Sequence, residues 1–184
     1  MDNGASSYRR FLSGEKEGLS EIVCSYNDAL IMYINSLVHN FGDAEELAAD
    51  VFAKLIAIKP RYSGKSTFKT WLFAIARHTA IDFLKKSSRL SNEPIEAMYD
   101  ISDGSDLEKK YLDEEQKIEL HHALNKLNSE YSQVIYLSYF EGFSNAETAA
   151  IMKKSKRQVE KLLYNAKQSL KKILEKEGFE YEEL

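Results

Sequence analysis

Aromatic and basic side chains alternate in residues 61–89, which have the sequence RYSGKSTFKTWLFAIARHTAIDFLKKSSR. The stretch opens with a polar loop at 62–67 and continues without Gly or Pro, which predicts a helix ending in a basic cluster. Unpaired bases stack on aromatic rings and phosphates bind Lys or Arg, so this mixture suits a single-stranded nucleic acid. A core helix with a basic rim is the alternative, and the stretch alone does not choose between them. In both cases we expect Trp71 to belong to the core.

A second concentration of positive charge lies in residues 153–172, where eight Lys and Arg residues accompany one acid, Glu160. Two sequences typical of capping boxes, at 144–147 and 155–158, each predict the start of a helix. The two Ala residues at 149–150 are small enough to let the second helix cross the first closely, as in a helix-turn-helix. Because the protein is acidic as a whole, phosphate binding explains this local charge better than solubility does.

The composition favours an all-α protein. Of the 184 residues, 43% are hydrophobic and 29% are charged, and only two are Pro and eight are Gly. This length allows one domain or two small ones. The net charge is −4, but acidic and basic residues are concentrated in separate segments of the chain. This distribution is more informative about function than the net charge. No apolar run approaches the length of a membrane span and the N-terminus lacks an apolar signal core, so we expect a cytoplasmic protein without membrane insertion.

The helices that precede and follow the basic stretches can be placed by periodicity. Apolar residues recur at threes and fours over 19–38, which predicts one or two amphipathic helices. We expect a stop at 40–42 and then a capping box, in which Asp43 caps a helix that ends before Pro60. Residues 91–115 are acidic and contain turn residues in their first half, which indicates a flexible linker. Helix then returns near 107 and continues to a left-handed cap at 141–142.

The residue types offer little for catalysis or metal binding. Cys24 is the only cysteine, which excludes an internal disulfide, and we expect it to be buried as a small hydrophobe in a reducing compartment. The four His residues have no spacing typical of a zinc site. No Gly-rich phosphate loop follows a strand, and nothing pairs a nucleophile with a base. We therefore expect no enzyme activity, no cofactor and no metal.

Three motifs follow one another along the chain: Asp43-Ala44-Glu45-Glu46-Leu47 through Asp50-Val51-Phe52, Phe68-Lys69-Thr70-Trp71-Leu72 through Arg77 and Asp82, and the helix-turn-helix within 123–170. Together they resemble the extracytoplasmic-function (ECF) class of bacterial RNA polymerase sigma factors, in the sigma-70 family. The resemblance covers about 19–174. Each motif is modest evidence by itself, but their order and spacing are highly specific.

The resemblance implies two small helical domains, 1–90 and 113–184, joined by a flexible acidic linker at 91–112. The first would bind core RNA polymerase and melt the minus-ten promoter element, and the second would bind the minus-thirty-five element. The implied partners are core polymerase, promoter DNA and an anti-sigma factor. The implied polymerase contacts are Asp43, Glu46, Asp50, Phe52 and Lys54. The implied minus-ten contacts are Tyr62, Ser63, Lys65, Ser66, Thr67, Lys69, Arg77 and His78. The implied minus-thirty-five contacts are Ser155, Lys156, Arg157, Gln158, Glu160, Lys161, Tyr164 and Lys167.

Several positions depart from the family pattern, so no base preference is transferred. His78 stands where many members have Asn, and Lys153 occupies a turn position often held by Gly. Ala49, Glu160, Leu162 and Asn165 also differ from common members. Two other function classes stay open from the residues alone: a helix-turn-helix regulator with an N-terminal helical sensor or dimerisation domain, and an interaction protein such as an anti-sigma factor. The second leaves the basic segment 153–172 unexplained.

Overall fold

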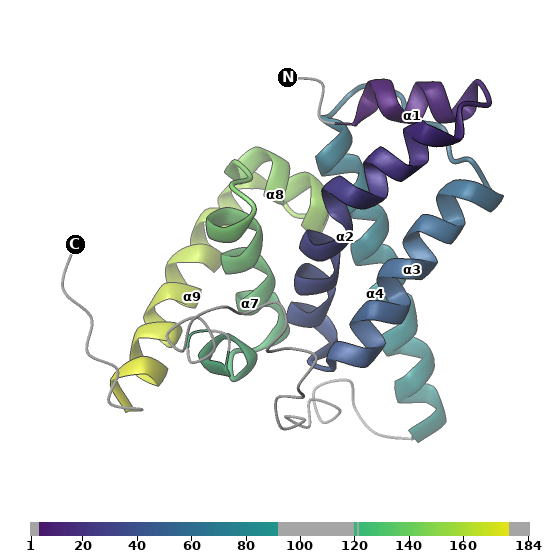
Figure 1. The fold of residues 1–184 in the computed structure, drawn as a ribbon. Helices are drawn as coiled ribbons and strands as arrows, with labels where there is room; N and C mark the ends of the chain where they lie inside the picture. The colour runs from purple at the N-terminus through teal and green to yellow at the C-terminus, as the bar shows by residue number, and fades with distance from the viewer. Residues whose placement is uncertain (1–3, 92–119, 121, 177–184) are drawn as a thin grey trace.

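The computed structural model describes residues 4–91, 120 and 122–176, and every regular element within these ranges is helical (Figure 1). The predicted all-α class is therefore confirmed for them. The predicted acidic linker lies almost entirely outside the described residues. The elements are α1 (Ala5–Leu12), α2 (Lys16–Val38), α3 (Phe41–Ala57), α4 (Phe68–Ser91), α7 (Ser129–Ile135), the π-helix η2 (Tyr136–Phe140), α8 (Asn145–Met152) and α9 (Lys156–Lys176).

The junction between α2 and α3 differs from the sequence prediction. α2 ends at Val38, its C-cap His39 adopts a left-handed conformation with φ 52°, and Asn40 is the N-cap of α3. The Asn40 side chain accepts a hydrogen bond from the Asp43 backbone N–H at 3.0 Å, so Asp43 is the capped residue and not the cap. Phe41, predicted to lie in a stop, is buried and begins the helix. An Asn side chain is a strong cap, and burial of Phe41 favours this earlier start.

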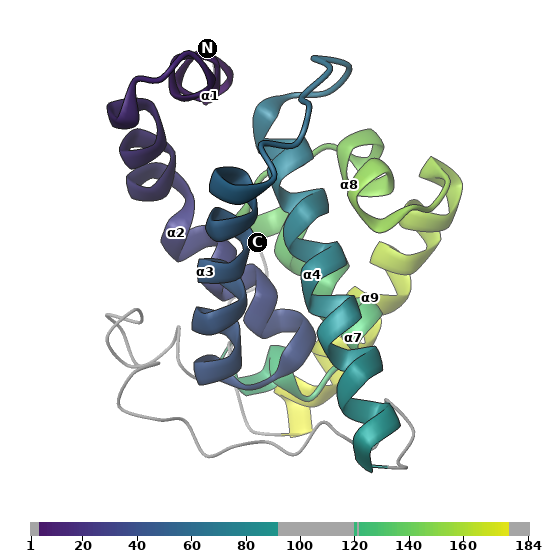
Figure 2. The same cartoon turned by 90° about the vertical axis from the view of Figure 1, so that its right-hand side faces the viewer.

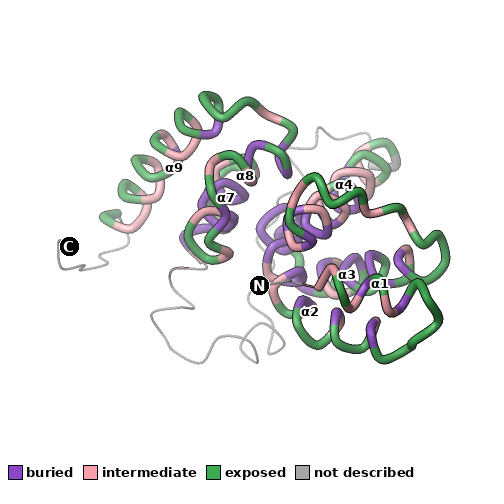
Figure 3. The backbone as a smooth tube through the Cα atoms, turned by 90° about the horizontal axis from the view of Figure 1, so that it is seen from above, coloured by how far each residue is buried: buried purple, intermediate pink, exposed green. Residues whose placement is uncertain are grey.

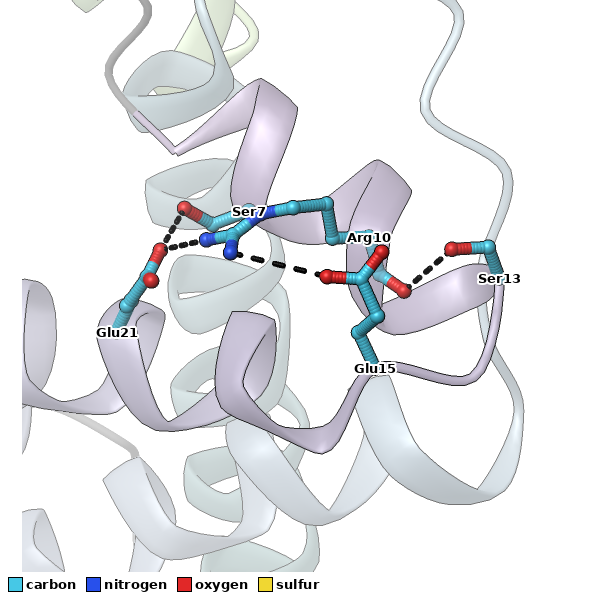
Figure 4. Close-up of polar contacts among 5 residues, drawn as sticks. All are labelled: Ser7, Arg10, Ser13, Glu15 and Glu21. Carbon is cyan, nitrogen blue, oxygen red and sulfur yellow. Dashed lines mark hydrogen bonds and ion pairs between the residues drawn. The ribbon is translucent and has the colours of Figure 1, made fainter.

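The first helix, α1, was not predicted from the sequence. Its Tyr8 is 1% exposed and donates a hydrogen bond to the Pro60 carbonyl at 2.8 Å. Figure 4 shows how α1 is tied to α2: Ser7 donates to the Glu21 carboxylate at 2.6 Å, and Arg10 binds the same carboxylate. The hydrogen bond from Arg10 is the main cause that lowers the pKa of Glu21 below its usual value. These contacts are long-range, which is why local pattern did not reveal them.

Helix α4 is buried on two sides. In Figure 2 it lies between α2 and α3 on one side and the C-terminal helices on the other. Phe68 and Leu72 enter the core of the N-terminal helices, whereas the Phe73 ring lies 5.2 Å from Tyr33 and 5.1 Å from Phe143 of the C-terminal helices. Side chains of α4 therefore pack against both groups of helices.

The C-terminal helices form the predicted helix-turn-helix. The capping box of α8 is complete, with Ser144 and Glu147 bonded reciprocally, and Ser155 and Gln158 form the same arrangement at the start of α9. Between the two helices Lys153 adopts a left-handed conformation with φ 54°. The predicted left-handed cap after η2 is also present, since Gly142 has φ 68°. Both predicted capping boxes are therefore confirmed.

The two helical groups share one hydrophobic core, which runs from α1 through α4 to α9. Cys24 was predicted to be buried, but it is exposed on α2, because it lies on the side of that helix opposite the buried residues Ile22, Tyr26 and Leu30. In the described part of the chain no helix is long and apolar enough to cross a membrane.

Candidate polymerase and nucleic-acid interface

The polar loop 62–67 is anchored at its first residue. The Tyr62 hydroxyl donates to the Ser66 carbonyl, and the Tyr62 ring lies 5.6 Å from Phe68 and 5.3 Å from Trp71. Gly64 has φ 72°, a conformation that favours glycine and lets the backbone turn sharply. Ser63, Lys65 and Thr67 remain exposed. The loop therefore presents polar groups to solvent from a fixed aromatic base.

Trp71 belongs to that base. Its ring lies 5.3 Å from Tyr8, 5.3 Å from Tyr62 and 5.4 Å from Phe68, and it packs against the core while half-buried. These distances are typical of aromatic pairs that stabilise one another. The expectation that Trp71 is part of the core is confirmed, with the difference that it is not fully buried.

The other predicted minus-ten residues lie along α4 and differ in their surroundings. His78 is exposed, and its Nδ1 lies 3.0 Å from a carboxylate oxygen of Asp82 one turn later. Lys69 instead pairs with Glu141 of the C-terminal domain at 2.8 Å. Arg77 donates from Nε to the side-chain oxygen of Gln133 at 3.0 Å. The sequence did not indicate that two of the cations predicted to bind DNA contact the C-terminal helices.

The predicted polymerase-binding residues all lie on one helix, α3, but they differ in how far they are exposed to solvent. Glu46 and Asp50 are exposed. Asp43 is half-buried, and burial, followed by the nearby Glu46 charge, raises the pKa of its carboxyl. Phe52 is 7% exposed and lies in the hydrophobic core, where it supports the helix.

Lys54 occupies the groove between α3 and α4. Its Nζ donates to the Thr79 hydroxyl at 2.8 Å. The groove has a volume of about 520 Å³ and is lined by residues that include Asp50, Lys85 and Arg89. Asp50 of α3 thus lies beside basic side chains contributed by the end of α4.

Seven of the predicted minus-thirty-five residues lie on α9 and Ser155 directly precedes it. One side of this helix is exposed along its length (Figure 3). Val159 and Ala166 point inward and hold the helix against α7 and α8. The side chains exposed along the helix are Lys156, Arg157, Gln158, Glu160, Lys161, Tyr164 and Lys167. The cations of the first turn add to the positive end of the helix dipole. This arrangement can bind phosphates, and the side chains of the first two turns are placed as those of a recognition helix are.

Five of these residues already have partners, and two of them, Lys156 and Glu160, form an ion pair at 4.0 Å with each other. Ser155 and Gln158 form the reciprocal cap, so their side chains fix the start of α9. Lys167 lies over the Tyr139 ring, 4.9 Å from its centroid. Among the described residues no group of three His, Cys, Asp or Glu side chains is placed to hold a metal ion.

Comparison with known proteins agrees with this arrangement. Residues 22–90 match the family model described as Sigma-70 region 2, and residues 117–170 match Sigma-70, region 4. The RNA polymerase sigma factor SigV of Bacillus subtilis is 30% identical over 142 residues, which cover 77% of this chain and 82% of SigV. The ECF RNA polymerase sigma factor SigX of the same organism is 26% identical over 157 residues, or 82% of this chain and 80% of SigX.

Among solved structures, the sigma factor RpoE in complex with the anti-sigma factor NepR, from Bartonella quintana, has a similar fold. The TM-score is 0.66 at 22% identity, over 85% of this chain and 96% of RpoE. The chain matches both region models in the family's order, and it matches a relative over most of that relative's length. These matches exclude an unrelated helix-turn-helix regulator. The chain belongs to the sigma-70 family of RNA polymerase sigma factors, in its ECF class, and directs promoter-specific transcription initiation by core RNA polymerase.

Proposed function

We propose that the N-terminal domain opens the promoter by capturing unpaired bases of the minus-ten element at loop 62–67. The observation that carries this proposal is the exposed polar loop held by Tyr62 on a fixed aromatic base. Ser63, Ser66 and Thr67 supply hydrogen-bonding groups, and Lys65 supplies a charge for a neighbouring phosphate. An ordered loop loses little conformational freedom on binding, so less of the interaction energy is spent on ordering the loop and the strand binds more tightly.

The energy for strand separation comes from differential binding. A base that leaves the duplex loses stacking, and a base that is held against protein groups regains roughly 1–3 kcal/mol. The loop binds only the open strand. It therefore shifts the equilibrium from duplex to open promoter by the difference between its binding free energies for the two forms. No bond is made or broken, and we propose that the chain has no catalytic activity of its own.

The test uses Lys65→Ala in holoenzyme, with Lys16→Ala as the control, since both residues are exposed lysines of the N-terminal domain. On a duplex promoter we expect Lys65→Ala to slow open-complex formation about tenfold, while core binding is unchanged. A promoter that carries a pre-melted bubble should restore most of the rate, because the step that the loop assists has been bypassed. Normal opening of duplex promoters by Lys65→Ala would remove the loop from the mechanism.

We propose that Glu46 and Asp50 on α3 contact core polymerase. Both are exposed acids of α3, which lies within the match to Sigma-70 region 2, and Asp50 also lines the groove that Lys54 occupies. Asp43 and Lys54 would contribute from the two ends of this surface, and Phe52 would support it from the core. Charge complementarity of this kind controls association rate and partner choice.

We propose that α9 binds the minus-thirty-five element as duplex DNA. Lys156, Arg157 and Lys161 would contact phosphates or base edges from the first turns, and Glu160, Tyr164 and Lys167 would border them. Removing a pure phosphate contact, for example in Lys161→Ala, should lower the salt slope of duplex binding by about 0.9 and affect all sequences alike. A base contact should instead cost about 1–3 kcal/mol at one base pair. A variant that changes neither quantity leaves its residue outside the interface.

The partners follow from the family. We propose that the protein acts with RNA polymerase in the cytoplasm and is restrained by an anti-sigma factor, as RpoE of Bartonella quintana is bound by NepR. Co-purification of a cytoplasmic partner that suppresses transcription by the holoenzyme would identify such an inhibitor.

A further inference from the structure

Helix α1 contacts the segment that leads from α3 into loop 62–67. The Tyr8 hydroxyl donates to the Pro60 carbonyl at 2.8 Å, two residues before the loop begins. About one turn further along α1, the centroid of the Phe11 ring lies 5.5 Å from the Lys59 ammonium group. Lys59 has φ 48°, a left-handed conformation that a residue with a side chain adopts only at a cost in free energy. Both contacts of α1 thus fall where the chain leaves α3 and turns into the loop.

The two ends of loop 62–67 are held in different ways. At the exit, the Thr67 hydroxyl accepts a hydrogen bond from the Thr70 backbone N–H at 3.1 Å, and the Thr67 carbonyl accepts one from the Trp71 N–H at 3.1 Å. These bonds lie within the first turn of α4, so they form together with that helix. The entry segment instead contacts α1, which is distant in the sequence. The position of the loop entry therefore depends on where α1 lies.

Tyr8 also belongs to the aromatic base beneath the loop. Its side chain is 1% exposed, and its ring lies 5.6 Å from Phe68 and 5.3 Å from Trp71. Burial raises the pKa of Tyr8 above its usual value, so the hydroxyl stays protonated and remains a donor. One side chain of α1 thus contacts both the base of the loop and the backbone at its entry.

The position of α1 is itself fixed by α2. A Cβ atom at Gly18 would lie 2.2 Å from the Ser7 carbonyl oxygen and 2.8 Å from the Phe11 backbone nitrogen, both on α1. Neither distance is accessible to a real Cβ atom, so a larger residue at this position would move α1 away from α2. About one turn later, the Glu21 carboxylate accepts hydrogen bonds from the Ser7 and Arg10 side chains (Figure 4). A close crossing and a polar tie therefore hold α1 over α2.

We propose that α1 is a positioning element for promoter opening: through Tyr8 it holds the entry of loop 62–67 in the conformation that captures the open strand. The proposal rests on the function proposed above for this loop. Both α1 and Gly18 lie outside residues 22–90, which match Sigma-70 region 2. Buried Tyr8 acts through the Pro60 carbonyl and the aromatic base, and not by touching DNA. By restricting the free loop, α1 lowers the conformational entropy that the loop loses on binding.

The test uses Tyr8→Phe, which removes one hydroxyl and keeps the ring among its aromatic neighbours. Tyr33→Phe is the matched control, because the Tyr33 hydroxyl is buried without a hydrogen-bond partner in the described chain. In the free protein we expect the backbone amides of 59–66 to exchange hydrogen about fivefold faster in Tyr8→Phe, with exchange in α3 and in the control unchanged. Equal exchange of this segment in wild type and Tyr8→Phe, measured by mass spectrometry, would overturn the proposal.

The functional measurement is the rate of open-complex formation by holoenzyme. On a duplex promoter we expect Tyr8→Phe to slow opening about fivefold, the effect of one lost hydrogen bond, with core binding and the Tyr33→Phe control unchanged. A promoter with a pre-melted bubble should restore most of the rate. In a Lys65→Ala background, Tyr8→Phe should slow opening by less than about twofold more, because both changes act through the same loop. A normal rate for Tyr8→Phe, or effects that simply multiply, would contradict a positioning role.

A second variant, Gly18→Ala, displaces α1 from the side that faces α2. Gly42→Ala is its control, since a Cβ atom there would meet only the Asn40 side chain, at an ordinary distance of 3.5 Å. We expect Gly18→Ala holoenzyme, with its fold checked by circular dichroism, to open duplex promoters at least about fivefold more slowly and Gly42→Ala to open them normally. Normal opening by folded Gly18→Ala would remove α1 from the mechanism. Failure of the loop's own role is a separate result, in which Lys65→Ala alone opens duplex promoters at the wild-type rate.

Discussion

The aromatic cluster beneath loop 62–67 makes a quantitative prediction for Phe68→Ala. The Phe68 ring is 1% exposed and lies 5.6 Å from Tyr8, 6.0 Å from Tyr26, 5.6 Å from Tyr62 and 5.4 Å from Trp71. It is thus the ring that connects α1, α2 and the loop to α4. Its removal should leave a cavity that these rigid neighbours cannot fill.

Truncation of a fully buried Phe costs about 3–5 kcal/mol, made up of lost transfer energy and the cavity left behind. That is a large part of the 5–15 kcal/mol that stabilises a typical domain. Trp71→Ala should cost less, about 2–3 kcal/mol, because the Trp71 ring is only half-buried. Loop 62–67 would also lose its base in both variants, so promoter opening should slow even where the protein stays folded.

The assay is urea denaturation followed by far-UV circular dichroism, with Phe140→Ala as the matched control. Phe140 is 48% exposed, so the same truncation there should change the free energy of unfolding by less than about 1 kcal/mol. A loss below about 1 kcal/mol in Phe68→Ala, or equal losses at the two positions, would refute the idea that this cluster supports the loop.

Three further predictions concern other parts of the chain. Reversal of both charges in Glu46→Lys with Asp50→Lys should weaken capture of core polymerase at least about tenfold with helicity unchanged, and unaffected capture would move the interface elsewhere. Lys153→Gly should raise stability by about 0.5–1 kcal/mol, because glycine adopts the left-handed turn without strain, and a lower melting temperature would contradict this. The pKa of Glu147 is lowered from its ordinary 4.5, chiefly by the hydrogen bond from the Ser144 side chain. The ionised Glu147 carboxylate therefore stabilises the fold at pH values above 4.5, and this contribution is lost as the pH falls through the lowered pKa. Thermal melts of wild type and Glu147→Gln between about pH 6 and pH 3 should therefore converge at the acid end, and parallel curves would exclude this carboxylate.

Local signals in the sequence were sufficient for the helices that carry the proposed sites. The aromatic periodicity of α4 and the two capping boxes at Ser144 and Ser155 depend on neighbours within a few residues, and the structure has them as predicted. The cap of α3 was misplaced by three residues because both Asn40 and Asp43 are good caps, and only burial of Phe41 favours the earlier one.

Contacts between distant parts of the chain left no such signal. Tyr8 reaches the Pro60 carbonyl across 52 residues, and Lys69 reaches Glu141 across 72. No periodicity or cap reports which charged side chains will meet at that separation. The exposure of Cys24 was missed for a related reason. Whether a residue in the apolar stretch 19–38 is buried depends on which side of the helix packs against other helices, and the sequence did not show this for Cys24.

Transcription by purified core polymerase on fragmented genomic DNA, with the 5′ ends of all transcripts mapped, tests the central claim most directly. With this chain added, we expect discrete start sites that core alone does not use, each preceded by two shared sequence elements at a constant separation. A chain that leaves the start sites of core polymerase unchanged would contradict its assignment as a promoter-specificity subunit.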